Sequence, residues 1–279
     1  MAVHRRLTSA AIRARKGTRF AVVTAYDTPF ARCAEGAGID VLLVGDSLGM
    51  VVLGHDATGA VELDDMCRHA GAVARGSTRA HVIVDMPFGS YEASEAEAIR
   101  SAIALVKSGA NSVKLEGGVR VAQSRIAAIV NAGIPVVGHI GVLPQTAALG
   151  DGFKRRTDRA VLLADARAVE AAGAFAVVLE MVDPGVAAEV TQSSSIPTIG
   201  IGSGNQCDAQ VLVIHDLLGL YPEAPPFVKR YAELGKIATE ALRAYAGEGK
   251  SGAFPAQAAP GKQRAQEDGE LPYTITTPS

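Results

Sequence analysis

Acidic side chains end several of the apolar, strand-like segments of this sequence. Asp46, Asp85 and Glu116 close the segments LLVGD, HVIVD and VKLE. Neighbouring strands lie about 5 Å apart, so these carboxylates would converge if the segments were adjacent in a parallel sheet. Three close anions raise one another's pKa, and Mg²⁺ prefers such oxygen ligands. We therefore predict a Mg²⁺ site at these acids, and disfavour zinc because His139 is the single soft ligand nearby.

Two further charged residues suit chemistry on a 2-oxo acid. Lys114 is two residues before Glu116, so on a strand both side chains face the same way. A buried lysine there would bind a substrate carboxylate, or would instead pair with one of the three acids. Glu180 ends the apolar segment AVVLE, the sixth predicted strand, and is expected almost opposite the three acids. Its apolar surroundings would raise its pKa and make it a usable general base. Together with a divalent ion, these groups could remove a proton next to a carbonyl.

Other polar residues also lie at segment ends, with several interpretations open. These residues are Tyr26, Asp27, Ser47, His139, His215 and Asp216. For Asp27, His215 and Asp216, helix capping or loop hydrogen bonding explains the residue as readily as chemistry does. GIGSG at 200–204 resembles a dinucleotide-binding loop, but the next strand begins too soon to leave room for the required helix. A tight loop at the rim of the sheet is the better interpretation.

A repeated pattern along the chain predicts the elements that position these residues. Glycine precedes an apolar run in 36–46, 108–118, 131–141 and 171–181. Gly38, Gly109, Gly133 and Gly173 are placed to end helices in the left-handed conformation. Runs that are apolar on both faces are typical of strands in a parallel sheet. The other predicted strands lie in 20–27, 81–87, 197–202 and 210–216. Apolar residues with helical spacing predict helices in 62–75, 92–107, 119–130 and 158–171.

Eight such units within residues 20–216 predict a closed (β/α)8 barrel, with an open doubly wound sheet as the alternative. The domain is expected to span 1–247, with a final helix at 226–246 that packs on the barrel or on a neighbouring subunit. Residues 248–279 are rich in Gly, Pro, Gln and charge, which predicts a largely disordered tail. The Arg-rich start fits a targeting peptide or a short helix over 7–14, and we expect the helix.

The composition limits the classes of partner. The chain has 279 residues, 48% hydrophobic and 20% charged, with a net charge of −2. This balance gives no electrostatic reason to expect nucleic acid or an anionic membrane as a partner. Cys33, Cys67 and Cys207 are far apart and form no CxxC pair, so neither a zinc knuckle nor a disulfide framework is indicated. We expect a cytoplasmic enzyme acting on small molecules.

The motifs resemble those of the ketopantoate hydroxymethyltransferase family over residues 7–257. They include TAYD (24–27), LLVGDSLGMVVLGHD (42–56), DMPFGSYE (85–92), VKLEGG (113–118), GHIG and LPQ (138–145), VVLEMV (177–182) and IGIGSG (199–204). The resemblance implies a barrel of the phosphoenolpyruvate/pyruvate type. It also implies transfer of a hydroxymethyl group from 5,10-methylenetetrahydrofolate to 3-methyl-2-oxobutanoate, in pantothenate and coenzyme A biosynthesis.

The resemblance further implies a role for each site residue. Asp46, Asp85 and Glu116 would bind Mg²⁺, and Glu180 would accept the proton. The residues implied in oxo-acid binding are Asp46, Ser47, Asp85, Lys114 and His139. Members of the family form large homo-oligomers, typically decamers.

Three stretches depart from the family pattern: GDGFKRRTDR (150–159), TGAVE (58–62) and CDAQ (207–210). The first follows LPQ in a loop that is expected to lie over the site. This departure therefore concerns the use of folate and the rate more than the binding of the metal. The alternatives are a paralogue acting on another 2-oxo acid, a lyase or mutase of the same barrel superfamily, and a non-catalytic scaffold. The lyases carry a reactive cysteine in a KKCGH-type loop that no cysteine here matches. A scaffold predicts the loss of a strand-end acid, yet all are present.

Overall fold

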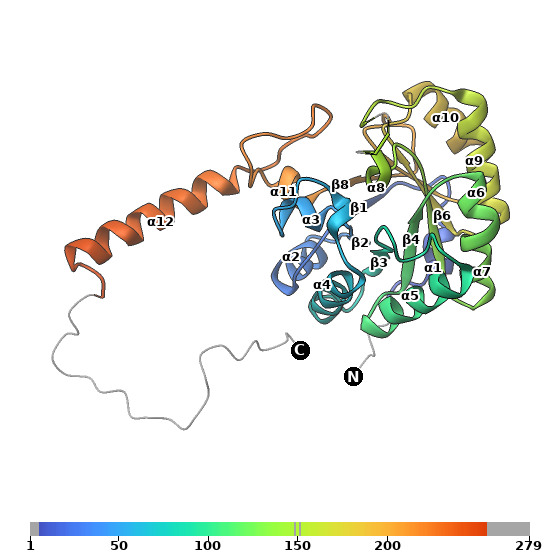
Figure 1. Cartoon of the computed structure of the whole chain (residues 1–279). Coiled ribbons are helices and arrows are strands. Elements are labelled where there is room, and N and C mark those ends of the chain that lie inside the picture. Colours follow the sequence, from blue (N-terminus) through green and yellow to red (C-terminus); the bar gives the residue numbers. More distant parts are fainter. Residues whose placement is uncertain (1–5, 148, 151, 256–279) are drawn as a thin grey trace. The chain divides into compact units, whose positions relative to one another are not determined.

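The computed structural model describes residues 6–147, 149–150 and 152–255, and its central feature is a closed barrel of eight parallel strands in chain order (Figure 1). The strands are β1 (Phe20–Thr24), β2 (Val41–Val44), β3 (His81–Asp85), β4 (Ser112–Glu116), β5 (Val136–Gly141), β6 (Ala176–Glu180), β7 (Thr198–Ile201) and β8 (Ala209–Leu212). Val22 of β1 pairs with both Val41 of β2 and Val211 of β8, which closes the barrel. The closed barrel is thus confirmed and the open sheet was the wrong alternative.

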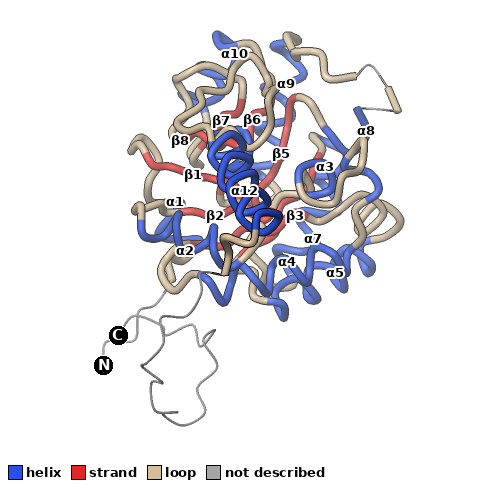
Figure 2. The backbone as a smooth tube through the Cα atoms, turned by 90° about the vertical axis from the view of Figure 1, so that its left-hand side faces the viewer, coloured by secondary structure: helices blue, strands red, loops and turns tan. Residues whose placement is uncertain are grey.

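Helices enclose the strands, as Figure 2 shows. The longer ones are α2 (Thr28–Gly36), α4 (Leu63–Gly76), α5 (Glu95–Ser108), α9 (Arg159–Ala171) and α10 (Pro184–Ser193). The shorter ones are α1 (Ser9–Arg13), α3 (Leu48–Val51), α6 (Val119–Val121), α7 (Ala127–Asn131), α8 (Pro144–Ala147) and α11 (Ile214–Leu217), with a 3₁₀ turn η1 (Thr58–Ala60). The helix expected over 119–130 is present but interrupted by a π-helical segment, η2 (Ala122–Ile126). No helix separates β7 from β8, as the short connection predicted.

Local signals set the helix ends as expected. In α5, the Ser94 hydroxyl accepts from the Glu97 N–H at 3.1 Å and satisfies one of the free donors of the first turn. Gly109 ends the same helix with φ 119°, a conformation that favours glycine, and donates back to the last turn. The other three predicted glycines, Gly38, Gly133 and Gly173, also have positive φ.

Two apolar clusters hold the barrel together. The inner one includes Val22, Val41 and Ile83 from the strands and also Ile12 of α1, which is fully buried. The expected helix over 7–14 is therefore present and contributes to the core, while residues 1–5 lie outside the described part of the chain. The outer cluster joins the opposite faces of the strands to the surrounding helices. No helix among the described residues is long and apolar enough to cross a membrane.

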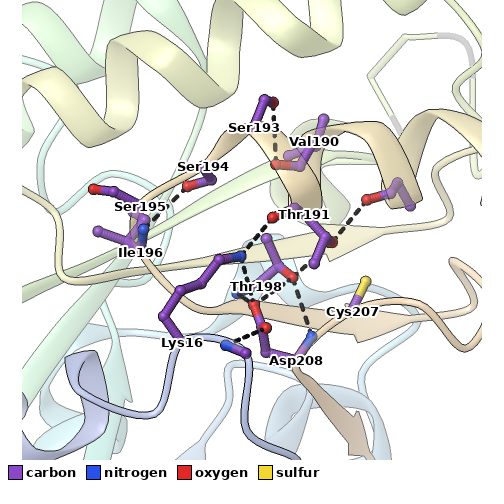
Figure 3. Close-up of polar contacts among 12 residues, drawn as sticks. Lys16, Val190, Thr191, Ser193, Ser194, Ser195, Ile196, Thr198, Cys207 and Asp208 are labelled. Carbon is purple, nitrogen blue, oxygen red and sulfur yellow. Dashed lines mark hydrogen bonds and ion pairs between the residues drawn. The ribbon is translucent and has the colours of Figure 1, made fainter.

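A polar network around Asp208 joins the segments before β1, β7 and β8 (Figure 3). One carboxylate oxygen accepts from Lys16 Nζ and from the Thr198 N–H, both at 2.9 Å, and the other accepts from the Gly17 N–H at 2.9 Å. Burial alone would raise the pKa of Asp208, but the hydrogen bonds from Thr198 and Lys16 hold it below its usual range. The network thus depends on a charged carboxylate.

Asp208→Asn is therefore expected to lower the free energy of unfolding by about 2 kcal/mol at pH 7, the value of hydrogen bonds to a charged group. Because the folded-state pKa is below the unfolded one, the stabilisation is present above the unfolded pKa and is lost as pH falls through the folded pKa. Urea unfolding should show that the difference in the free energy of unfolding between wild type and variant is smaller at pH 3 than at pH 7. Asp64→Asn, at an exposed side chain, is the control, and a gap independent of pH would contradict the prediction.

The chain divides after Ala232 into two compact units, and the second contains α12 (Leu234–Ser251). The final helix expected over 226–246 was wrong at both ends. Its first residues are not helical because their backbone N–H groups bond elsewhere, that of Val228 to the Pro225 carbonyl and that of Tyr231 to the Leu217 carbonyl. The helix then continues into the expected tail and ends at Gly252 with φ 74°. Residues from 256 onward lie outside the described part.

Candidate active site

The strand register brings the predicted site residues to one end of the barrel. Asp85 pairs with Lys114 across β3 and β4, and Glu116 pairs with His139 across β4 and β5. Asp46 follows β2 and reaches the same group, because its backbone N–H donates to Asp85 Oδ2 at 3.1 Å. All five side chains are buried.

Lys114 lies among the acids and is charged. Its ammonium is 3.1 Å from Asp85 Oδ1, so the lysine pairs with one of the strand-end acids, and its binding of a substrate carboxylate stays a prediction. Burial opposes the charge, but the carboxylates of Asp85, Glu116 and Asp46 raise the pKa of Lys114 above its usual range. The ammonium also lies 3.0 Å from His139 Nδ1.

His139 is therefore neutral, with its proton on Nε2. An ammonium can only donate, so His139 Nδ1 accepts from Lys114. Burial, and then the charge of Lys114, hold the pKa of His139 well below its usual range. The protonated Nε2 faces Glu180 Oε2 at 3.4 Å, and Nδ1 is 3.6 Å from Glu116 Oε1. His139 thus lies between the two glutamates, with Nδ1 toward Lys114 and Nε2 toward Glu180.

Glu180 has two properties of a general base, a raised pKa and a partly exposed side chain. Burial raises its pKa to about 8; the charge of Lys114 lowers it, and those of Asp46 and Asp85 raise it. Its side chain remains 19% exposed, so a substrate can reach it. We expected Glu180 opposite the three acids, but the barrel order places it beside His139, with β5 between its strand and that of Glu116.

Gln145 and Tyr91 connect the acids, and neither was among the predicted site residues. Gln145 donates from Nε2 to Asp46 Oδ2 at 2.8 Å and from its backbone N–H to Glu116 Oε2 at 3.1 Å. Tyr91 donates to Gln145 Oε1 at 2.6 Å and fixes which way the amide points. Gln145 follows β5 closely in the LPQ motif, and Tyr91 lies in DMPFGSYE after β3, so position after a strand was the signal that could have found them.

The remaining strand-end residues have separate roles. Tyr26 OH and Ser47 Oγ are 2.9 Å apart, so Ser47 lies beside Asp46 with its hydroxyl oriented by the tyrosine. Asp27 caps α2 by accepting from the Phe30 N–H at 2.8 Å. His215 stacks on Tyr221 at 6.1 Å and lies 5.4 Å from the Tyr26 ring. For Asp27, the capping interpretation is confirmed.

The divergent stretch 150–159 contacts the backbone directly after Glu180. Arg155 donates to the carbonyls of Val182 at 2.8 Å and Gly202 at 2.7 Å. The Arg156 N–H donates to Met181 O at 2.8 Å. Met181 has φ 49°, a conformation that residues with side chains rarely adopt and that persists where neighbours enforce it. This stretch therefore helps to set the backbone that carries the base.

The charge of the site fits an added cation. Burial, and then Asp85, raise the pKa of Asp46 to about 7, while burial also raises the pKa values of Asp85 and Glu116. Within the described part of the chain, no three His, Cys, Asp or Glu side chains are grouped as ready metal ligands. Mg²⁺ commonly needs only one or two protein carboxylates and keeps several waters. The adjacent Asp46 and Asp85 therefore fit that ion better than they would fit zinc.

Comparisons with known proteins agree with this architecture. A family model described as "Ketopantoate hydroxymethyltransferase" matches residues 6–257. The 3-methyl-2-oxobutanoate hydroxymethyltransferase of Ignicoccus hospitalis is 50% identical over 247 residues, 87% of this chain and 94% of that protein. The enzyme of the same name from Heliobacterium modesticaldum is 52% identical over 247 residues, 86% and 89% of the two chains.

Solved structures show the same fold at lower identity. A phosphonopyruvate hydrolase in complex with oxalate and Mg²⁺ is 16% identical, has a TM-score of 0.60 and covers 88% of this chain and 87% of its own. A 2,3-dimethylmalate lyase of the PEP mutase/isocitrate lyase superfamily is 18% identical, has a TM-score of 0.58 and covers 93% of each chain. These two likenesses show that the chain shares the barrel fold of these enzymes.

Proposed function

The chain belongs to the ketopantoate hydroxymethyltransferase family, and on that premise we propose that it transfers a hydroxymethyl group from 5,10-methylenetetrahydrofolate to 3-methyl-2-oxobutanoate. The product would be 2-dehydropantoate, a precursor of pantothenate and coenzyme A. The observation that carries the proposal is the buried ammonium of Lys114 among the strand-end acids. Glu180, whose pKa is raised, lies on the other side of the neutral His139 and can act as the base. These groups suit removal of a proton next to a carbonyl.

In the proposed reaction each site residue has one task. Lys114 binds the carboxylate of the oxo acid, and Ser47 lies within the same group of polar side chains. Glu180 takes the C3 proton, since His139 already carries its proton on the nitrogen that faces this glutamate. The C3 carbon then forms a bond to the one-carbon unit. Water supplies the new hydroxyl, both carbon–nitrogen bonds break, and the two folate nitrogens recover protons from C3 and from water.

We propose that Asp46 and Asp85 hold Mg²⁺, with Glu116 bound directly or through water. When bound, the ion would polarise the oxo group and stabilise negative charge on its oxygen. Gln145 orients Asp46 and Glu116 through its two hydrogen bonds, so the acids are held apart in fixed positions. The neutral His139 keeps Glu116 separate from the base.

Incubation of the protein with Mg²⁺, 5,10-methylenetetrahydrofolate and 3-methyl-2-oxobutanoate tests the proposed function. We expect 2-dehydropantoate and tetrahydrofolate in equal amounts by mass spectrometry. A panel of other 2-oxo acids tests the paralogue alternative, and faster turnover of one of them would replace the proposed substrate. Cleavage of the oxo acid with no folate present would favour the lyase alternative.

Lys114→Ala is expected to weaken oxo-acid binding at least tenfold. A charged hydrogen bond contributes about 1.5–3 kcal/mol, and each 1.4 kcal/mol is about tenfold in the dissociation constant. Calorimetry with the Mg²⁺-loaded protein measures the effect, and Lys114→Met separates loss of charge from loss of side-chain volume. Lys107→Ala, at an exposed lysine of α5, is the control. An unchanged dissociation constant in both Lys114 variants would leave this lysine as a structural partner of Asp85.

We also propose that the protein is a cytoplasmic homo-oligomer, with a decamer as the expected size. The helix α12 carries exposed apolar side chains, Ile237 at 59%, Leu242 at 67% and Tyr245 at 61%. Large exposed apolar surfaces of this kind are typical of protein interfaces. Light scattering at micromolar concentration should give the mass of an oligomer, and Leu242→Glu should lower it. A monomer mass for the wild type would contradict the proposal.

A further inference from the structure

The glycine-rich loop 200–204 contacts the segment that carries Glu180. Ser203 of this loop is buried, with 1% of its surface exposed. Its hydroxyl accepts from the Val182 N–H at 3.0 Å and donates to the Leu179 carbonyl at 2.7 Å. One buried hydroxyl therefore joins the backbone before and after the glutamate.

The backbone directly after this glutamate turns in an unusual way. Met181 has φ 49°, and it is the one residue other than glycine with a positive φ in the described part of the chain. Such a conformation is uncommon for a residue with a side chain and persists where neighbouring contacts enforce it. The Met181 N–H donates to the Ile201 carbonyl at 2.9 Å, and Ser203 accepts from the next N–H, that of Val182. The end of β7 and the loop after it thus bind two successive N–H groups of the turn.

The neighbouring strand β5 encloses Glu180 from the other side. The Glu180 carbonyl accepts from the Val142 N–H at 2.9 Å. Gly141, the last residue of β5, has φ 100°, and a Cβ added there would lie 2.2 Å from the same carbonyl oxygen. The close approach of the two backbones therefore requires glycine, and the backbone of Glu180 cannot shift toward β5.

The carboxylate of Glu180 depends on this backbone for its position. It faces His139 Nε2 at 3.4 Å, which is longer than the about 2.7–3.2 Å of a usual N–H···O hydrogen bond. A contact of this length orients a side chain weakly. A general base must nevertheless come within hydrogen-bond distance of the proton that it removes. The direction in which the backbone points the side chain is therefore important for the reaction.

We propose that Ser203 is a positioning residue for the general base. Its hydroxyl holds the left-handed turn at Met181 and thereby directs the Glu180 carboxylate toward C3 of the oxo acid. The inference rests on the proposed function, because it takes Glu180 as the group that removes the C3 proton. It gives the loop 200–204 a task in catalysis, although the loop itself touches neither substrate.

Ser203→Ala tests this role, because it leaves the Val182 N–H without its acceptor and frees the turn. We expect exchange of the C3 proton of 3-methyl-2-oxobutanoate in D₂O to slow about tenfold, since a misplacement of about 1 Å can cost about a hundredfold in rate. Calorimetry with the Mg²⁺-loaded protein should give an oxo-acid dissociation constant within about twofold of the wild type, because Lys114 is unchanged.

The matched control is Ser112→Ala, which removes another buried hydroxyl. Ser112 is the first residue of β4, and its hydroxyl lies 2.8 Å from His81 Nε2. This variant should lose stability in urea as Ser203→Ala does, yet exchange the C3 proton at the wild-type rate. Ser203→Cys keeps a weak donor and acceptor at the same place, so its exchange rate should lie between those of Ser203→Ala and the wild type. It also replaces Ser203→Ala in the experiment if that variant does not fold.

A double-mutant cycle with Glu180→Gln separates positioning of the base from a general effect on the fold. We expect Ser203→Ala to leave the residual exchange of Glu180→Gln unchanged, because no base remains to be positioned. Equal slowing in both backgrounds, or exchange at the wild-type rate in Ser203→Ala, would overturn the role of Ser203 and leave the proposed function intact. Exchange at the wild-type rate in Glu180→Gln itself would instead overturn the assignment of the base.

Discussion

Glu180→Gln is expected to lose C3–H exchange of 3-methyl-2-oxobutanoate in D₂O by a factor of about 10²–10⁴, the usual cost of removing a general base. Binding of Mg²⁺ and of the oxo acid should stay near the wild-type level, because Glu180 faces His139 and is not one of the residues proposed to hold the ion or the substrate carboxylate. Proton NMR follows the exchange, and calorimetry follows the two binding steps.

The pH dependence gives this prediction a second readout. A carboxyl group must be deprotonated to act as a base, and burial raises the pKa of Glu180 to about 8 in the metal-free chain. The exchange rate of the wild type should therefore rise with pH toward that value. A nearby divalent ion favours the charged form, so the rise should occur at lower pH in the Mg²⁺-loaded protein. In Glu180→Gln the residual rate should lack this rise.

The control for this experiment is Glu95→Gln, which alters an exposed glutamate in the first turn of α5. Exchange at the wild-type rate in Glu180→Gln would move the base elsewhere, and His139 would be the next candidate. That role would require His139 to give up its hydrogen bond with Lys114 or its Nε2 proton. Loss of Mg²⁺ binding in Glu180→Gln would instead identify this glutamate as a ligand.

Metal removal is expected to abolish activity, and Mg²⁺ to restore it. The buried acids outnumber Lys114, and the raised pKa of Asp46, to about 7, reflects burial and the neighbouring Asp85. Because ligands must be deprotonated, Mg²⁺ binding near neutral pH should release protons. Calorimetry in two buffers of different ionisation enthalpy measures this release without reference to activity.

Asp46→Asn and Asp85→Asn should each weaken Mg²⁺ binding, whereas Glu116→Gln should have a smaller effect if a water lies between Glu116 and the ion. Asp64→Asn is the control. Full activity of protein treated with EDTA and freed of metal would contradict the metal proposal. Equal Mg²⁺ affinity in all four variants would place the ion away from these acids.

The barrel was predictable because each strand carries its own signal. A run that is apolar on both faces, after a glycine that ends a helix, marks a strand such as β4 or β6 without knowledge of its neighbours. The same periodicity placed Lys114 and Glu116 on the inner face. Strand order then brought Asp85 beside Lys114 and Glu116 beside His139.

Features that depend on contacts between distant segments were not predictable in this way. Gln145 reaches Asp46 across 99 positions of the sequence, and no local pattern marks that hydrogen bond. The helix expected from Pro226 failed because the Tyr231 N–H bonds to the Leu217 carbonyl instead of to its own turn. Glu180 was placed opposite the acids, whereas barrel closure makes His139 its neighbour.

The hydrogen bonds from Arg155 and Arg156 to the backbone of residues 181–182 and 202 couple the stretch 150–159 to the segment that follows Glu180. Sequence changes in these segments should therefore depend on one another during evolution. A loop graft that replaced 153–157 without an arginine at position 155 would remove the side-chain donor to Val182 and Gly202, next to Met181 with its left-handed backbone. Mutations in the two segments should therefore be accepted as pairs, and laboratory recombination of this chain with a relative should favour crossovers that inherit both segments from one parent. A graft that kept an arginine at position 155 should retain more activity than one that did not.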